Sequence, residues 1–342
     1  MKIALDAMGG DNAPEVEVRG AVAAAKEFGI EVVLVGDEEK IRAELSSYML
    51  KYKIKKLPIS IVHASEVVTM NDSPTKVVNQ KKDSSLIVAM RLVKEGKADA
   101  VISAGNTGAV MTHALSVLGR IPNVARPAIA AFFPSLNGKC LVLDVGANSD
   151  NKPEHLLQFA VMGSVYLKYV GESDNPRIGL LSVGEEEKKG NKLTSESAKM
   201  MKAAGLNFVG NVEGRDIVGD KADVIVCDGF VGNIVLKFAE SVATRFFQIL
   251  KVELQNSSIF IKFGALLVKP VFRGLIKKTD YAEHGAAPLL GIDGQVFIGH
   301  GGSSVKAVKN AINTAAKSVT GKVNEHIKEE IAKLGVVDNG IH

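Results

Sequence analysis

The stretch VISAGNTGAV, residues Val101–Val110, contains an apolar run that ends at Ser103, a Gly-Asn-Thr-Gly loop and the start of a run of small residues. The apolar run predicts a strand, and the small residues predict a helix that begins directly after the loop. The same order returns in LVLDVGANSD, residues Leu141–Asp150, and in VIVCDGFVGN, residues Val224–Asn233. The sequence therefore predicts repeated strand–loop–helix units, which are typical of α/β proteins.

Strand-like and helix-like segments alternate along nearly the whole chain. The strand-like runs are four to seven residues long and lack a clear apolar–polar alternation, which predicts burial on both faces of a mainly parallel sheet. We expect Asp37 to cap a helix and Gly321 to break the closing helix. The sequence predicts a three-layer α/β/α sandwich over residues 1–342 as one domain, from which residues 245–280 protrude as a helical segment.

Composition excludes several classes of protein. The 342 residues are 46% hydrophobic, which allows a large core, but the net charge of +4, the absence of Trp and the 5% aromatic content argue against nucleic-acid binding. The two cysteines form no CxxC motif, so no zinc site or redox pair is indicated and a reduced cytoplasmic setting fits. We expect no membrane-spanning helix, because no uninterrupted apolar run approaches about 18 residues, and no signal peptide.

The three Gly- and Asn-containing loops all follow predicted strands. Ligands of parallel sheets gather beyond the carboxyl ends of strands, and free N–H groups at helix starts attract anions. We therefore expect the loops to line one pocket for phosphate or for a developing oxyanion, although each loop alone is also compatible with an ordinary turn. The usual nucleotide motifs, GxxxxGK[ST] and GxGxxG after a strand, are absent.

Charged residues near these loops are further candidates. SVGEEEKKGNK, residues Ser182–Lys192, is either a solvated loop whose charges compensate one another or a loop that places Lys188 or Lys189 at the mouth of the site. Arg126 is a candidate second anion ligand. His300, in the turn GHGGSS, ranks below Lys189 because a single His near a turn is more often structural.

Cys227 and several aspartates raise two other kinds of chemistry. A nucleophilic Cys227 lacks an obvious His partner in the matching loops, so a buried structural cysteine is favoured. The aspartates are candidates for a metal site, for helix caps or for partners of Lys and Arg, and the last two readings are preferred; they are Asp6, Asp11, Asp144, Asp150 and Asp228.

Eight motifs taken in order resemble the bacterial phosphate acyltransferases of phospholipid synthesis. They are ALDAMGGDNAP, SAGNTGA, GRIPNVARPA, LDVGANSDNKPEHLLQFAVMGSVY, VGEEEKKGN, GNVEGRD, DGFVGNIVLK and GHGGSS, and they run from the first predicted strand to about Ala311. The resemblance implies a fold similar to isocitrate dehydrogenase and phosphotransacetylase. It also implies transfer of a fatty acyl group from acyl carrier protein to inorganic phosphate. Because a thioester is already activated and its thiol leaves readily, we expect this reaction to need neither a cofactor nor a metal.

The resemblance further implies partners and a site. The partners are acyl carrier protein, a second copy of the chain in a homodimer, the inner face of the cell membrane and a downstream membrane glycerol-3-phosphate acyltransferase. The implied catalytic residues are Lys189, in EKKGN, and Asn233, in DGFVGN. On physical grounds we expect Lys189 to bind phosphate and Asn233 to donate to the thioester carbonyl. The residues expected to contact substrate are Gly105, Asn106, Thr107, Gly108, Arg126, Asp144, Gly146, Asn148, Asp228, Gly229 and His300.

Residues 255–279 carry five cations and no acidic residue among many large apolar side chains. We expect Pro270 to break this segment into two short helices. The segment either covers the core or the dimer interface, meets an anionic membrane, or guides the acidic acyl carrier protein. Two rival functions stay open: a phosphotransacetylase-like enzyme that uses acyl-coenzyme A, and a non-enzymatic adaptor at the membrane surface.

Overall fold

The computed structural model describes residues 1–135, 138–279 and 283–338. Its strands form one eleven-stranded sheet in the order β3-β2-β1-β4-β11-β10-β5-β6-β9-β7-β8. The strands are β1 (Lys2–Asp6), β2 (Glu31–Gly36), β3 (Ile59–His63), β4 (Ala100–Ser103), β5 (Ala128–Ser135), β6 (Gly138–Leu143), β7 (Ile178–Leu181), β8 (Phe208–Val212), β9 (Val224–Val226), β10 (Ala286–Leu290) and β11 (Gln295–Gly299).

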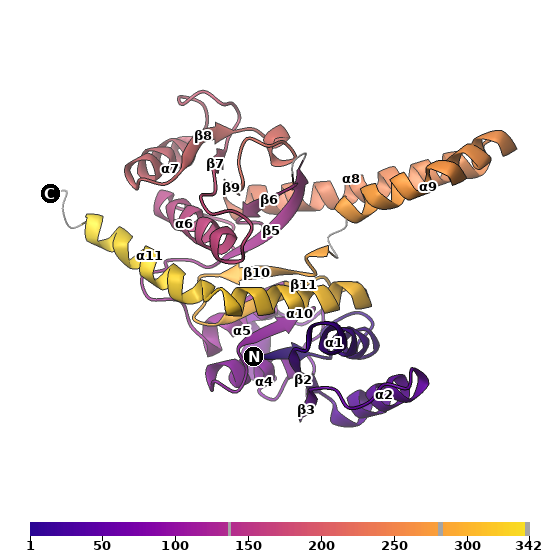
Figure 1. Ribbon diagram of the computed structural model, residues 1–342. Coiled ribbons are helices and arrows are strands. Elements are labelled where there is room, and N and C mark those ends of the chain that lie inside the picture. The colour runs from indigo at the N-terminus through magenta and orange to yellow at the C-terminus, as the bar shows by residue number, and fades with distance from the viewer. Residues whose placement is uncertain (136–137, 280–282, 339–342) are drawn as a thin grey trace.

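Helices cover both faces of this sheet, which confirms the predicted α/β/α sandwich (Figure 1). They are α1 (Glu15–Phe28), α2 (Glu38–Lys51), α3 (Pro74–Gln80), α4 (Ser85–Lys94), α5 (Thr107–Val117), α6 (Pro153–Tyr169), α7 (Lys192–Ala203), α8 (Gly229–Asn256), α9 (Ile259–Thr279), α10 (Val305–Thr320) and α11 (Val323–Asp338), with a short 3-10 turn at Gly214–Ile217. Asp37 caps α2 by accepting a hydrogen bond from the N–H of Lys40, and Gly321 ends α10, as predicted.

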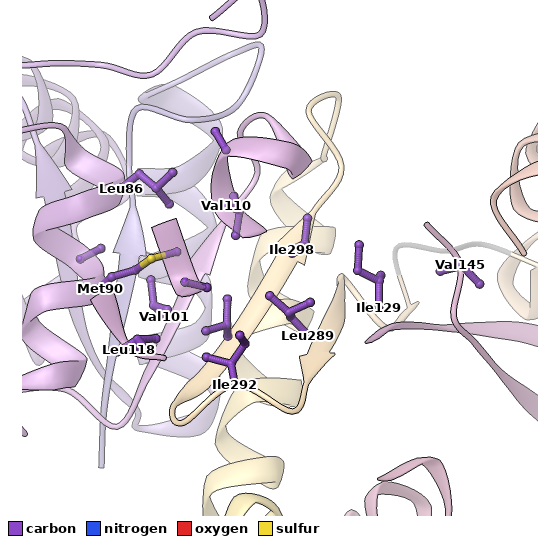
Figure 2. Close-up of a cluster of buried hydrophobic side chains, with 14 of the residues drawn as sticks. Leu86, Met90, Val101, Val110, Leu118, Ile129, Val145, Leu289, Ile292 and Ile298 are labelled. Atoms are coloured by element: carbon purple, nitrogen blue, oxygen red, sulfur yellow. The ribbon is translucent and has the colours of Figure 1, made fainter. Parts of the chain in front are cut away.

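Neighbouring residues of a strand enter the cores on opposite faces of the sheet. Val142 of β6 packs on the same side as α4 and α5, whereas Leu141 and Leu143 pack against α6 and α11. The first of these cores runs without a break from Leu86 and Met90 of α4 past β10 to Ile129 and Val145 (Figure 2). Burial on both faces explains why the strands read as continuous apolar runs.

The direction of the sheet reverses at its centre. The β4–β11 pair is parallel, but β11–β10, β10–β5 and β5–β6 are all antiparallel. The other pairings are parallel, so the sheet is mainly parallel, as predicted. Three reversals leave β6, β9 and β7 running opposite to β1, β4 and β11.

Two details differ from the sequence-based expectations. Strand β10 was not predicted; it is only five residues long and contains Pro288. The break expected at Pro270 is wrong, because α9 continues from Ile259 to Thr279 with Pro270 inside it. An interior proline removes one backbone donor and usually kinks or breaks a helix, but the residues on both sides of Pro270 belong to one helix. The chain instead turns at Ser257–Ser258, between α8 and α9.

The second part of α8 and all of α9 form an antiparallel helical hairpin that projects away from the sheet (Figure 1). From Asn233 to Val271, none of the described side chains is buried. None of the helices in the described part of the chain is long and apolar enough to cross a membrane.

Candidate active site

The predicted site residues separate into two groups that lie at opposite ends of the strands. The word edge means here the side of the sheet at which a group of strands ends, not an outermost strand. Gly105–Gly108 and His300 follow β4 and β11 at one edge, which we call the β4 edge. Asp144–Asn148, Lys189 and Asp228–Asn233 follow β6, β7 and β9 at the other, which we call the β6 edge. The expectation that the three loops share one edge is therefore wrong, because the β5–β6 reversal separates them.

Asp144 organises the turn that follows β6. Its carboxylate is fully buried and accepts hydrogen bonds from the N–H groups of Ile129 (3.1 Å), Gly146 (3.1 Å), Ala147 (2.9 Å) and Asn148 (2.8 Å). The side-chain amide of Asn148 is a fifth donor, at 2.8 Å. Burial raises the pKa of Asp144, while these donors favour its charged form.

This arrangement limits what the turn can bind. The N–H groups of Gly146, Ala147 and Asn148 all point at Asp144, so they are engaged and do not form an open cradle for phosphate. The amide nitrogen of Asn148 donates to the carbonyl of Pro127 (2.8 Å) as well as to Asp144. An anion bound beside this turn must therefore be held by groups other than these three N–H groups.

The first turn of α8 packs directly on this turn. A β-carbon on Gly229 would lie 2.2 Å from the carbonyl oxygen of Asn148, and one on Gly232 would lie 1.9 Å from that of Asp144, so only glycine fits at either position. Asp228 caps the helix by accepting from the N–H of Val231 (3.0 Å). The carboxylate of Asp228 therefore holds the start of α8.

Asn233 lies one turn after Gly229 and is exposed. Its side chain lies over Gly146, where a β-carbon on the glycine would be 3.4 Å from Cβ, Cγ and Oδ1 of Asn233. The amide is thus supported from below by the Asp144 turn and open to solvent above. This geometry suits a neutral donor for a substrate oxygen.

The loop after β7 presents two lysines. Within the described residues, Glu185 pairs with Arg215 (3.0 Å) and Lys221 (3.1 Å), and Glu187 pairs with Lys202 (2.7 Å). No ion pair of Lys188 or Lys189 occurs in that part of the chain. The acidic run is compensated from outside the loop, which leaves both ammonium groups available for an anion.

Asn211, which sequence reasoning missed, fixes this loop. Its buried amide donates to the carbonyls of Glu186 (3.0 Å) and Lys189 (3.3 Å), and the hydroxyl of Ser182 also donates to the carbonyl of Lys189 (3.3 Å). The backbone of Lys189 is therefore held while its side chain is exposed. The GNVEGRD motif, which contains Asn211, was the available signal.

Arg126 and Cys227 complete the β6 edge. Arg126 is exposed and precedes Pro127, whose carbonyl is bound by Asn148. Cys227 is buried, its thiol contacts the carbonyl oxygen of Asp144 (3.3 Å), and burial raises its pKa well above the usual range. These observations support the structural reading of Cys227 over the nucleophilic one.

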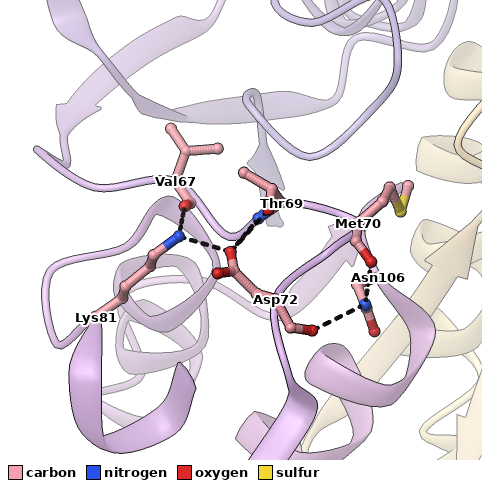
Figure 3. Close-up of polar contacts among 6 residues, drawn as sticks. All are labelled: Val67, Thr69, Met70, Asp72, Lys81 and Asn106. Carbon is pink, nitrogen blue, oxygen red and sulfur yellow. Dashed lines mark hydrogen bonds and ion pairs between the residues drawn. The ribbon is translucent and has the colours of Figure 1, made fainter. Parts of the chain in front are cut away.

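At the β4 edge, Asn106 ties two loops together (Figure 3). Its Oδ1 accepts from the N–H of Ala109 (3.0 Å) at the start of α5, and its Nδ2 donates to the carbonyls of Met70 (3.0 Å) and Asp72 (3.5 Å). Asp72 in turn binds Lys81 and Thr69. The amide of Asn106 is occupied within the protein, and Thr107 and Gly108 form the first turn of α5.

The β4 edge also contains two buried acids. Asp6 accepts from the hydroxyl of Ser103 (2.7 Å) and from the N–H of Met8 (3.1 Å), and burial raises its pKa. Glu17, which sequence reasoning missed, is 1% exposed, and its Oε2 has no partner among the described residues. Burial, with further repulsion from Asp6 and Asp11, raises the pKa of Glu17 to about 7.

Asp6 and Asp144 accept hydrogen bonds from hydroxyl and amide donors. Within the described residues they neither cap a helix nor pair with Lys or Arg, so the preferred reading of the aspartates holds for Asp228 but not for these two. Across residues 1–135, 138–279 and 283–338, no group of three or more His, Cys, Asp or Glu side chains is arranged to hold a metal ion.

Comparison with known proteins identifies relatives over nearly the whole chain. Residues 1–326 match the family model described as fatty acid synthesis protein. The chain is 54% identical to the phosphate acyltransferases of Geotalea daltonii and Geobacter sulfurreducens, in each case over 97% of this chain and 94% of the relative. It is 50% identical to the phosphate acyltransferase of Syntrophotalea carbinolica, over 98% and 94%.

Solved structures with a similar fold have much lower identity. A phosphotransacetylase from Streptococcus pyogenes superposes with a TM-score of 0.64 at 19% identity and 94% coverage of both chains. A 4-hydroxythreonine-4-phosphate dehydrogenase from Klebsiella pneumoniae gives 0.55 at 14% identity, with 93% of this chain and 99% of that chain covered. At these identities the likeness concerns the fold.

Proposed function

Because the chain belongs to the fatty acid synthesis protein family, whose members above are phosphate acyltransferases, we propose that it transfers a fatty acyl group from acyl carrier protein to inorganic phosphate. The product, an acyl phosphate, supplies phospholipid synthesis. The observation that carries this proposal is the identity of about half of all residues to phosphate acyltransferases along 97% of the chain.

The proposed reaction needs no covalent intermediate with the protein. An oxygen of phosphate attacks the thioester carbonyl carbon, a tetrahedral oxyanion forms, and the carbon–sulfur bond breaks with its electron pair on sulfur. The thiolate leaves readily and takes a proton from solvent. Since phosphate is already an anion, the protein has to align the reactants, which contributes about 7–11 kcal/mol in favourable cases.

We assign the two tasks to the β6 edge. Lys189 binds and neutralises phosphate. Its fixed backbone supports that role, as does its ammonium group, which makes no ion pair within the described residues. Asn233 donates to the oxyanion, and its exposed amide above Gly146 supports that role. Arg126 is a second anion ligand, and Asp144, Gly146, Asn148, Asp228 and Gly229 shape the surface below the substrate.

The β4-edge residues Gly105–Gly108 and His300 stay candidates for substrate contact of a different kind. Gly105–Gly108 follow β4, beside the point between β1 and β4 where the strand order reverses. The connection after β1 leads toward β2, and the connection after β4 leads the other way, toward β5. Ligands of open α/β sheets bind at such switch points. We propose that residues 1–342 act as one unit, with residues 245–280 as its protruding part.

For partners, we propose a homodimer at the inner face of the cell membrane, in the cytoplasm, which delivers its product to a membrane glycerol-3-phosphate acyltransferase. The outer side of α8 supports the dimer, because Ile234, Phe238, Val242 and Ile249 are at least 49% exposed. The outer side of α9 supports the membrane contact, because Phe260, Phe263, Leu267 and Val271 are at least 63% exposed on a helix that has no acidic residue.

The alternative donor is acyl-coenzyme A, as the likeness in fold to a phosphotransacetylase suggests. The two donors are separated by offering acyl-acyl carrier protein and acyl-coenzyme A of the same chain length at equal concentration. The proposal expects a much higher kcat/KM for the carrier-protein thioester and no saturable binding of free coenzyme A. Preference for acyl-coenzyme A would favour the alternative, and turnover of neither would favour the adaptor.

A further inference from the structure

The helical hairpin contains an apolar groove between its two helices. The groove has a volume of about 630 Å³, and its apolar lining comes from Phe247, Leu250 and Leu254 of α8 and from Ala265 and Leu266 of α9. Phe247, Leu250 and Leu254 are three and four residues apart, so they lie on one face of α8, and Ala265 and Leu266 line the groove from α9. The groove is open to solvent, and its volume is that of a small-molecule site.

Three lysines stand among the apolar residues of this groove: Lys251 of α8, and Lys262 and Lys269 of α9. None of the described residues that line it is acidic. In the described part of the chain none of the three lysines takes part in an ion pair, in contrast to the compensated loop after β7. An apolar groove that also contains these lysines is complementary to a molecule that has one hydrocarbon chain and one anionic head.

We infer that the groove between α8 and α9 binds one molecule of a single-chain anionic amphiphile, with its chain on Phe247, Leu250 and Leu254 and its head on the lysines. That the natural amphiphile is the acyl phosphate rests on the proposed function. Phe247 and Leu254 are seven residues apart, about 10 Å along the helix axis, so the groove holds part of a long chain. The outer faces of the hairpin are left for the membrane and the second subunit.

Dodecyl phosphate is a suitable probe, because it has the chain and the charged head but contains no acyl bond to react. Below its micelle concentration it should bind the full-length protein with saturation in calorimetry. Removal of two methylenes should weaken binding by about 15-fold, since each methylene accounts for roughly a factor of four. Dodecanol, which lacks the charge, should bind at least tenfold more weakly.

Two tryptophan variants test whether dodecyl phosphate binds in this groove. Ala265→Trp fills the groove and should lower the affinity for dodecyl phosphate at least tenfold. Val252→Trp adds the same side chain to α8 at a half-exposed position outside the groove and should bind like the wild type. Circular dichroism of both variants checks that the helices are intact. The Lys262→Ala, Lys269→Ala double variant should lose affinity for dodecyl phosphate but not for dodecanol.

The inference is overturned if Ala265→Trp with intact helices binds dodecyl phosphate as tightly as the wild type. It is equally overturned if the protein binds anionic vesicles but no monomeric dodecyl phosphate, because the hairpin would then recognise a lipid surface alone. The probe requires no turnover, so a failure of the proposed acyl transfer would leave this binding measurable. In that case the groove would stand and only the identity of its natural ligand would change.

Discussion

The side-chain amide of Asn233 rests on the backbone of Gly146, with its Oδ1 3.4 Å from the place that a β-carbon of Gly146 would occupy. Gly146 has a φ of +136°, a conformation that other residues rarely adopt. Its backbone N–H is one of the five donors to the Asp144 carboxylate. Buried Asp144 thus fixes the conformation of the turn at Gly146, α8 packs on that turn, and Asn233 lies on α8 at this contact.

Replacement of Asn233 by Ala should lower turnover by about 10²- to 10³-fold, because one donor to the developing oxyanion is lost. The melting temperature should change little, since the side chain is exposed. Lys237→Ala, one helical turn further along α8 and also exposed, is the matched control and should retain its rate. A folded Asn233→Ala protein with a near-normal rate would remove Asn233 from the mechanism.

Lys189→Ala should raise the KM for phosphate by roughly 10- to 100-fold, the effect of losing one charge-assisted contact. Lys188→Ala should have a clearly smaller effect. The difference follows from the carbonyl of Lys189, which Asn211 and Ser182 hold in place. Steady-state rates at varied phosphate provide the test. If the Lys188 variant is the more impaired, the two assignments must be exchanged.

Glu17 should make stability depend on pH. Its pKa is about 7 in the folded protein and about 4.5 in the unfolded chain. Between these values the folded protein retains a proton that the unfolded chain has lost, so stability falls as the pH rises through this window and is not affected by this group below it. The total effect is up to about 3 kcal/mol.

Glu17→Gln removes this titration. Relative to the wild type, its free energy of unfolding should therefore increase from pH 4.5 to pH 7.5, as followed by urea denaturation. Glu15→Gln, an exposed change on the same helix, is the control and should show no such trend. A difference between Glu17→Gln and the wild type that is constant with pH would show that Glu17 is charged in the folded protein.

The outer face of α9 should bind the protein to anionic membranes. Flotation with anionic vesicles should recover the wild type, with less recovery on neutral vesicles and at high salt. The Phe263→Glu, Leu267→Glu double variant should not float. Leu50→Glu with Tyr52→Glu, at exposed positions on and just after α2, adds the same charge elsewhere and should float normally. Equal flotation of both double variants would take α9 out of membrane binding.

Much of the fold is predictable from local patterns. The strands and helices on either side of the Asn106 loop, the Asp37 cap and the interruption at Gly321 all follow from apolar runs and capping residues. The reversal between β5 and β6 was missed, although the sequence contained a signal for it. The apolar runs AIAAFF (residues 128–133) and CLVLDV (residues 140–145) predict two strands separated by only six residues. That is too short for the crossover that parallel pairing requires.

The site was predictable in its residues more than in its arrangement. Gly229 and Asn233 lie where the motifs indicated, but their relation to Gly146 depends on how α8 packs on a distant turn. Glu17 looks like an ordinary surface residue of an amphipathic helix, because its side chain is covered by the loop at Gly10, which comes from outside that helix. Strand direction and burial of this kind arise from contacts between distant segments, which local patterns do not record.

The most direct test of the central claim combines the purified protein, acyl-acyl carrier protein and inorganic phosphate, with hydroxylamine present to trap acyl phosphate as the hydroxamate. After subtraction of the slow direct reaction of hydroxylamine with the thioester, measured without protein, we expect free thiol and hydroxamate in equal amounts, only when both phosphate and protein are present, with the same rate in EDTA. Thiol release that does not depend on phosphate, or a rate that EDTA abolishes and a divalent ion restores, would contradict it.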